Sequence, residues 1–243
     1  MPVGFTLVFV DDTDEVRDRP DDTRDQDVSA IAALDEPTRR RLYDYVVREP
    51  EPVSRDDAAA ALGLARQTAA FHLDRLADES LLDVVYARRS GRTGPGAGRP
   101  AKLYRRSAKQ IAVSLPDRRY ELAGRLLAHA VEESGATGEP VRDVLHRAAR
   151  ECGARAGADG HEDGHEEVFP LLERYGFEPR YEGDAVVLGN CPFHTLARAH
   201  TRTVCGMNLH LLRGVLDGLG DTGFEAHLAP EPGRCCVRLE PAA

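Results

Sequence analysis

Residues 63–82, GLARQTAAFHLDRLADESLL, decide the fold of the first half of this chain. Gly63 ends one helical segment, and a turn of a few residues leads into the next. In that next segment Ala69, Leu73 and Leu76 recur at spacings of four and three, which places them on one buried face of a helix. The outward face then holds four residues: Arg66, Gln67, Ala70 and Asp74.

A second helix is predicted immediately before this one, in SRDDAAAALG at residues 54–63. Ser54 is a typical N-cap residue, acids follow it in the first turn, and Gly63 is a typical stop. Two short helices joined by a glycine-containing turn predict a helix-turn-helix.

A β-hairpin is predicted after the second helix. Residues 81–90 and 101–107 have strand-like sequences, and they flank GRTGPGAGRP at residues 91–100, which is too rich in Gly and Pro to be helical. The chain carries a net charge of −9, but residues 84–110 contain eight Lys or Arg and no acid. This basic hairpin, or wing, is suited to the DNA backbone or minor groove.

The expected contacts with DNA follow from this arrangement. Arg66, Gln67 and Thr68 lie in the first helical turn, where base edges come within reach, and Arg–guanine and Gln–adenine are the pairs that geometry favours. His72 has two readings, a base contact or a cap or packing role within the helix. Phosphate or minor-groove contacts are expected from the wing residues Arg88, Arg89, Arg99 and Lys102.

Composition predicts a tail and two domains. Residues 1–26, with 8 acids against 3 bases and little that is apolar after residue 10, are expected to be a disordered acidic tail. Residues 27–110 form the winged helix-turn-helix, and residues 111–243 form a mixed α/β domain, so the fold class is α+β. The apolar opening MPVGFTLVFV has no basic start or small-residue cleavage site, which predicts a cytoplasmic protein that spans no membrane.

The second domain is expected to begin with two amphipathic helices, at residues 117–134 and 140–157. Their apolar stripes suit either a dimer seam or an intramolecular core. A hairpin at 177–190, two helical segments and two closing strands are predicted to follow. The stripe residues are Leu122, Leu126, Leu127 and Val131 on the first helix and Val141, Val144, Leu145 and Ala148 on the second.

Five cysteines in a reducing compartment are expected to be metal ligands, redox thiols or buried apolar residues rather than disulfides. Cys152 lies on the second stripe, which favours burial. Cys191, Cys205 and Cys235 lie at element boundaries, and their wide spacing differs from the close pairs of zinc sites and the tight runs of ferredoxins. Because neighbouring strand residues point to opposite faces, we expect only one of Cys235 and Cys236 to face a shared site.

Two resemblances sharpen these expectations. Residues 63–82 followed by GRPAKLY at residues 98–104 resemble the winged helix of ArsR-type transcription regulators, with a departure at Ser80, where that family commonly has glycine. NCPFHTLARAHTRTVCGMNLHLLRGVLDGL at residues 190–219, with the later PGRCCVRL, is similar to the SufR-type iron-sulfur-sensing repressors of actinobacteria and cyanobacteria.

The second resemblance implies a function. It implies a repressor that holds an iron-sulfur cluster of the [4Fe-4S] type through Cys191, Cys205 and Cys235. We expect this regulator to bind double-stranded operator DNA as a homodimer. Cys236 is an extra thiol in this comparison, and the fourth ligand is open among Cys236, an external thiol or water, and the histidines His194, His200 and His210.

Two rival functions remain open from the residues alone. One is a winged-helix regulator that senses a small molecule or zinc, with structural thiols. The other is an enzyme with a cysteine nucleophile, which requires an activating base and an orienting group. His194 and His200 are near Cys191 in sequence, but no recognisable nucleophile motif is present.

Overall fold

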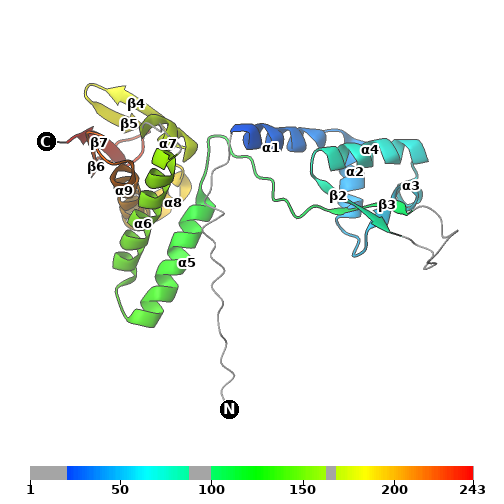
Figure 1. Cartoon of the computed structure of the whole chain (residues 1–243), viewed down its shortest axis with the longest axis horizontal. Helices are drawn as coiled ribbons and strands as arrows, with labels where there is room; N and C mark the ends of the chain where they lie inside the picture. The colour runs from blue at the N-terminus through cyan, green and yellow to red at the C-terminus, as the bar shows by residue number, and fades with distance from the viewer. Residues whose placement is uncertain (1–20, 88–99, 163–167, 243) are drawn as a thin grey trace, which may run out of the picture. The chain divides into compact units, whose positions relative to one another are not determined.

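The computed structural model describes residues 21–87, 100–162 and 168–242 (Figure 1). The chain divides into two compact units, with the boundary between Val113 and Ser114, three residues beyond the end predicted for the winged helix at residue 110. Each unit has a hydrophobic core of its own.

The first unit is a three-stranded sheet packed with four helices. Its core is formed by Leu42, Val46, Leu73, Leu76 and Tyr104, all at most 1% exposed. The elements in chain order are α1 (Asp21–Ala33), α2 (Pro37–Val46), β1 (Val53–Ser54), α3 (Arg55–Leu62), α4 (Arg66–Asp78), β2 (Leu82–Ala87) and β3 (Ala101–Arg106).

Local signals fix the helix-turn-helix formed by α3 and α4. The Ser54 side chain accepts a hydrogen bond from the Asp57 backbone, and the Asp57 carboxylate accepts one from the Ser54 backbone, a reciprocal capping box. Gly63 ends α3 with a φ of 65°, a left-handed conformation that glycine adopts without steric cost. The predicted start and end of α3 are therefore confirmed, whereas the helix predicted over residues 65–82 ends earlier, because α4 stops at Asp78 and β2 begins at Leu82.

Helix α1 corrects the expected tail. Residues 21–26 were expected to be disordered, but they form the first part of α1. Their sequence alone supports no helix, because it lacks an apolar stripe. The helix is held by its far end, where Ala30 and Ala33 are buried against the core of the first unit.

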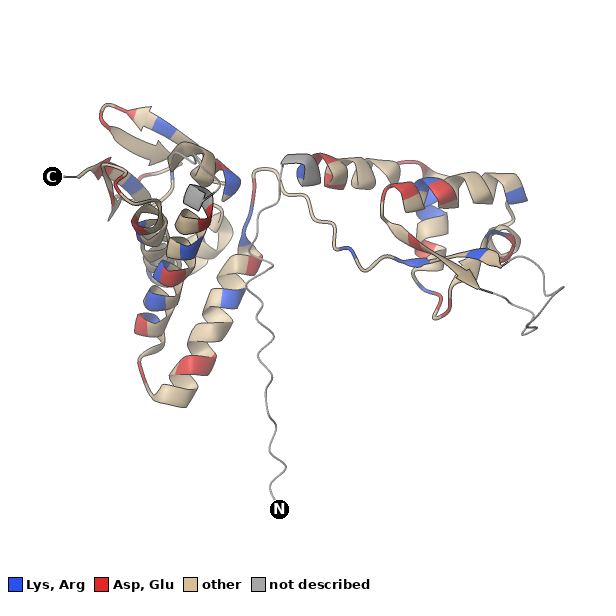
Figure 2. Cartoon of the chain, viewed as in Figure 1, with Lys and Arg blue, Asp and Glu red and all other residues tan. Residues whose placement is uncertain are grey.

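The wing strands pair as predicted. The sheet order is β1-β3-β2 and every pair is antiparallel, with Val84 opposite Tyr104. Figure 2 marks the positions of Lys and Arg residues on β3. The wing tip at residues 88–99, with Arg88, Arg89 and Arg99, lies outside the described residues.

The second unit is built around one long helix, α9, and a four-stranded sheet with the order β4-β5-β7-β6. All neighbouring strands are antiparallel, and Leu239 on β7 pairs with both Val186 and Ala226. The elements are α5 (Tyr120–Thr137), α6 (Val141–Glu162), α7 (Val168–Arg174), β4 (Pro179–Glu182), β5 (Ala185–Leu188), α8 (His194–Ala199), α9 (Thr201–Leu219), β6 (Phe224–Leu228) and β7 (Val237–Pro241).

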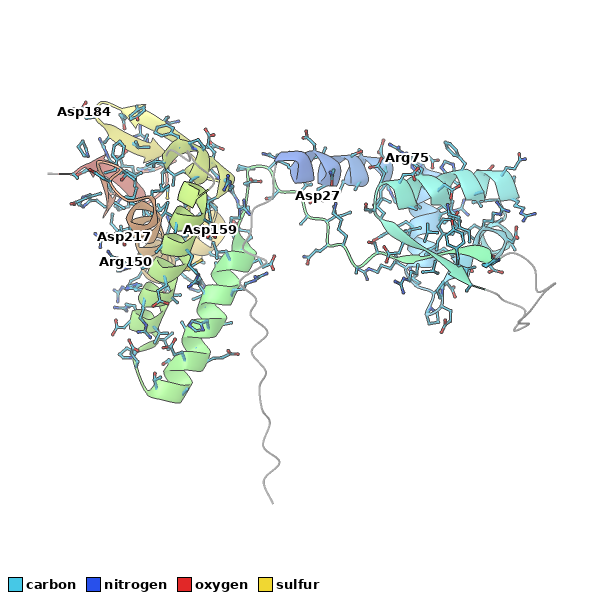
Figure 3. The ribbon with its side chains drawn as sticks, in the orientation of Figure 1. Asp27, Arg75, Arg150, Asp159, Asp184 and Asp217 are labelled. Atoms are coloured by element: carbon cyan, nitrogen blue, oxygen red, sulfur yellow. The ribbon has the colours of Figure 1, made fainter. Side chains whose placement is uncertain are left out.

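Helices α6 and α9 pack backbone against backbone. A Cβ atom added at Gly153 of α6 would lie 2.0 Å from the Leu211 carbonyl oxygen, and one at Gly214 of α9 would lie 2.0 Å from the Arg150 carbonyl oxygen. Only glycine permits so close an approach. At the surface, Arg150 Nε and Asp217 Oδ2 form an ion pair at 2.7 Å that joins the same two helices (Figure 3).

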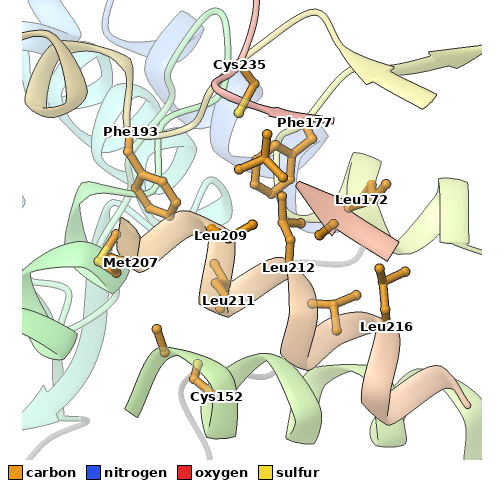
Figure 4. Packing of buried hydrophobic residues seen from close by; sticks show 14 of the residues in the cluster. Cys152, Leu172, Phe177, Phe193, Met207, Leu209, Leu211, Leu212, Leu216 and Cys235 are labelled. Carbon is orange, nitrogen blue, oxygen red and sulfur yellow. The ribbon is translucent and has the colours of Figure 1, made fainter. Parts of the chain in front are cut away.

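The two apolar stripes are mostly used inside the chain. Leu126, Val144, Leu145 and Ala148 belong to the core that α5 and α6 form with α9, whereas Val131 is 61% exposed. Cys152 lies in this core on α6, apart from Cys235, as Figure 4 shows. Its predicted burial is confirmed, and burial raises the pKa of its thiol. Among the described residues, no helix has the length and apolar character needed to cross a membrane.

Candidate nucleic-acid interface and cysteine site

The first turn of α4 presents the side chains that were predicted to read bases. Arg66, Gln67 and Thr68 are all exposed, directly after the N-cap residue Ala65. Arg66 Nε forms an ion pair of 2.6 Å with Asp56 Oδ1 on α3. Both partners are more than half exposed, so this pair is weak and the guanidinium is available for exchange to another acceptor.

His72 lies inward instead of on this outward face. Its side chain is 13% exposed, and Nδ1 lies 3.5 Å from Oε2 of Glu36, the N-cap residue of α2. Glu36 accepts backbone hydrogen bonds from Thr38 and Arg39, and these bonds lower the pKa of its carboxyl group to about 2. This geometry favours the packing role for His72 over the base contact.

Lys102 on β3 is engaged with the recognition helix. Its Nζ and the Tyr104 hydroxyl both donate to Asp74 Oδ1 at 2.6 Å. Desolvation would raise the pKa of Asp74, but these hydrogen bonds outweigh it and lower that pKa. The Lys102 side chain is 39% exposed, so it holds the wing strand on α4 while still facing solvent.

The predicted cysteines meet at one end of α9. Cys191 follows β5, Cys205 lies in the second turn of α9, and Cys235 precedes β7; all three are less than 9% exposed. The thiol of Cys235 is the hydrogen-bond donor toward Cys191 and Cys236, and the thiol of Cys205 donates to Cys236. Four sulfur atoms from three separate segments therefore lie in one group.

The expectation that only one of Cys235 and Cys236 faces the shared site is wrong. We expected the strand to include Cys235 and Cys236 and to turn one of them away. Strand β7 instead begins at Val237, so the alternation of a strand does not apply to the pair, and Cys236 links Cys235 to Cys205.

A buried polar residue on α9 also belongs to this group, and the sequence did not single it out. The Asn208 side chain is 0% exposed, its Nδ2 donates to Cys235 Sγ at 3.2 Å, and its Oδ1 has no hydrogen-bond partner among the described residues. Its position one turn after Cys205, on the apolar face of α9, is the signal that could have identified it.

The thiols differ in acidity because they share hydrogen bonds. Bonds from Cys235, Cys205 and Asn208 lower the pKa of Cys236 to about 6. A bond from Cys235 likewise lowers the pKa of Cys191. Burial, together with the bond to Cys236, raises the pKa of Cys205 to about 12. Cys236 is thus the thiol that ionises first near neutral pH, and its acidity comes from sulfur and amide neighbours and not from a histidine base.

A cavity of about 230 Å³ opens beside the thiols. Cys191, Cys205 and Cys236 line it together with His194, whereas Cys235 is not among its lining residues. Arg198, Arg234 and Glu231 also line it, and Arg234 forms ion pairs with Glu182 and Glu231. The other two histidines considered as ligands are elsewhere: His200 is exposed outside the cavity lining, and His210 stacks on His146 with ring centroids 4.2 Å apart.

The donor chemistry fits a soft metal or an iron-sulfur cluster, because thiolate is the ligand that both prefer. The positions of the side chains are a separate matter. As they stand, no three or more His, Cys, Asp or Glu side chains in the described part of the chain are arranged to hold a metal ion. Ligation therefore requires the side chains around the cavity to rearrange.

One comparison with known proteins bears on the first unit. A family model described as a helix-turn-helix domain matches residues 34–85, which run from the end of α1 into β2. No curated protein and no solved structure matches the chain. A helix-turn-helix domain with an exposed recognition helix points to a DNA-binding transcription regulator rather than an enzyme.

Proposed function

We propose that this regulator binds operator DNA through α4 and the wing, and that an iron-sulfur cluster on the second unit controls the binding. The observation that carries the proposal is the meeting of four thiols, from the segments around β5, α9 and β7, beside one cavity. Cys191, Cys205 and Cys235 would hold the cluster, which is of the [4Fe-4S] type, and Cys236 completes the set of sulfurs.

When bound, such a cluster would link these segments, and the link would be sensitive to oxidants and to iron supply. The chain's own residues do the rest. Asn208 donates to sulfur, and the thiols of Cys205 and Cys235 donate to Cys236. These features stabilise thiolate, which is the form that ligates iron.

The source of control in this proposal is the rearrangement that ligation demands. Segments that must move to bring their sulfurs into ligating positions exist in two arrangements, and a ligand that prefers one arrangement shifts the balance. A coupling of about 1 to 3 kcal/mol between the two sites changes operator affinity roughly 5- to 150-fold. We further propose that the chain acts as a homodimer on a two-fold operator and represses when the cluster is present.

The test compares three full-length proteins purified without oxygen: the natural chain, Cys191→Ser, and Cys152→Ser as the matched control. Cys152 is as buried as Cys191, at 6% exposure, but lies in the core of α6 outside the thiol group. Each protein is analysed for iron and acid-labile sulfide, and its affinity is measured for a duplex selected from a random pool.

The expected result is iron and sulfide in the natural chain and in Cys152→Ser, with both lost from Cys191→Ser and operator affinity changed by the factor given above. Equal affinities of the natural chain and Cys191→Ser would contradict the coupling. A colourless natural protein with stoichiometric zinc would replace the cluster by zinc and leave the DNA-binding function in place.

A further inference from the structure

Helix α4 exposes a large aromatic side chain on the face that was predicted to meet DNA. Phe71 is 65% exposed, although phenylalanine is among the residues most often buried. Gln67 lies four residues before it and Arg75 four residues after it, so all three share one face of the helix. An apolar ring between two polar side chains, on a recognition helix, is suited to an apolar target within a polar interface.

The ring of Phe71 packs against the neighbouring imidazole. It meets the imidazole of His72 edge to face, with ring centroids 5.2 Å apart and planes at 69°. His72 in turn lies 3.5 Å from Glu36, which caps α2. A chain of contacts therefore connects the exposed ring to the start of another helix, and this limits the conformations that the ring adopts.

Two arginines of α4 form ion pairs within the protein. Arg66 pairs with Asp56, and Arg75 pairs with Glu79 four residues later. Helical side chains lean toward the N-terminus of their helix, which places the ring of Phe71 over the turn that contains Gln67. Gln67 and Phe71 thus form one small reading surface, in which an amide lies beside an aromatic ring.

We propose that Phe71 is a specificity-determining residue that recognises thymine by packing on its 5-methyl group in the major groove. The thymine methyl group is the one apolar feature that base pairs present in that groove, and phenylalanine is among the residues that contact it. The neighbouring Gln67 suits adenine, whose major-groove edge accepts a bidentate amide. The pair selects for A·T base pairs at adjacent positions. This inference rests on the proposed function, because it requires α4 to enter DNA.

The experiment removes only the methyl group. The full-length natural chain, purified without oxygen, first selects duplexes from a random pool. Each thymine of the selected duplex is then replaced singly by deoxyuridine, and affinities are measured for the natural chain, for Phe71→Ala, and for Phe71→Leu. Tyr181→Ala is the matched control, because Tyr181 is an aromatic residue with 64% exposure on β4 of the second unit.

The expected result is at least one thymine whose replacement weakens binding of the natural chain about fourfold, which corresponds to about 0.8 kcal/mol for one buried methyl group. Phe71→Ala should bind the thymine and the deoxyuridine duplex equally. Phe71→Leu should keep part of the difference in affinity between these duplexes, and Tyr181→Ala should keep all of it.

Two outcomes would overturn the inference by different routes. A methyl effect that persists in Phe71→Ala, or a selected duplex in which no thymine shows one, removes the assigned contact while operator binding stands. A natural chain that enriches no sequence from the pool contradicts the DNA-binding function itself, and the contact fails with it.

Discussion

The amide nitrogen of Asn208 lies 3.2 Å from Sγ of Cys235, in a side chain that is 0% exposed to solvent. The same amide also reaches Cys236, and it lowers the pKa of that thiol. A buried amide whose oxygen has no described partner is costly to keep in an apolar interior. Its hydrogen bonds to sulfur offset that cost.

Replacement of Asn208 by leucine should leave the fold intact and make Cys236 less acidic. Leucine has a similar shape, and removal of an amide with an unpaired oxygen costs little. The donor is lost, so the pKa of Cys236 should rise from about 6, and its alkylation at pH 7 should slow. Site-resolved alkylation of the metal-free protein across pH measures this. Met207→Leu, at the buried neighbouring position, controls for repacking, and an unchanged pH midpoint in Asn208→Leu would contradict the role of the amide.

The glycines of α6 and α9 yield a prediction with opposite signs at two positions. Gly153→Ala should destabilise the second unit by about 1–3 kcal/mol or more, because the new Cβ would lie 2.0 Å from the Leu211 carbonyl oxygen. Gly124→Ala on α5 should stabilise it by about 0.5–1 kcal/mol, because nothing lies within 4 Å and alanine favours helix. Chemical denaturation measures both variants. A loss of stability in both, or in neither, would show that close packing of α6 and α9 is not what requires Gly153.

Ser80 is the position at which the sequence departs from the ArsR-type pattern, in which glycine is common. Its φ is 58°, so it holds the left-handed conformation that glycine adopts freely. Ser80→Gly should therefore stabilise the first unit by about 1 kcal/mol, as measured by thermal or chemical unfolding. Ser80→Ala is the control and should bring no such gain, because alanine keeps the unfavourable contact of Cβ.

The sequence predicted what local rules determine, and it failed where distant segments decide. The Ser54 cap, the stop at Gly63 and the pairing of β2 with β3 all follow from neighbouring residues, and the structure confirms them. Helix α1 has no apolar stripe of its own and depends on Ala30 and Ala33 meeting the core, so its first six residues were assigned to the tail.

The cysteine site shows the same division. The resemblance identified Cys191, Cys205 and Cys235, which the fold does bring together, but the strand rule misplaced Cys236 because β7 begins only at Val237, after both cysteines. No sequence rule reports that the amide of Asn208 meets sulfur 27 residues away, since that contact exists only after α9 has packed against the segment before β7.

The cap of α2 makes the stability of the first unit depend on pH. Glu36 accepts hydrogen bonds from the backbone of Thr38 and Arg39, which lower its pKa from the ordinary 4.5 to about 2. A carboxyl group with a lowered pKa in the folded state contributes stability above its unfolded pKa and loses it as pH falls through the folded one. The contribution of Glu36 should therefore be complete at pH 7 and should disappear between about pH 4.5 and pH 2.

Glu36→Gln isolates this contribution, because glutamine keeps the shape and loses the charge. The free energy of unfolding of Glu36→Gln should be lower than that of the natural chain at pH 7, and the two should converge near pH 2. Glu36→Asp keeps both a charge and a good N-cap, so it should follow the natural chain at every pH. A constant difference between the natural chain and Glu36→Gln across this range would mean that the ionised carboxylate does not hold the start of α2. The side chains of His72 and Phe71 would then be positioned by packing alone.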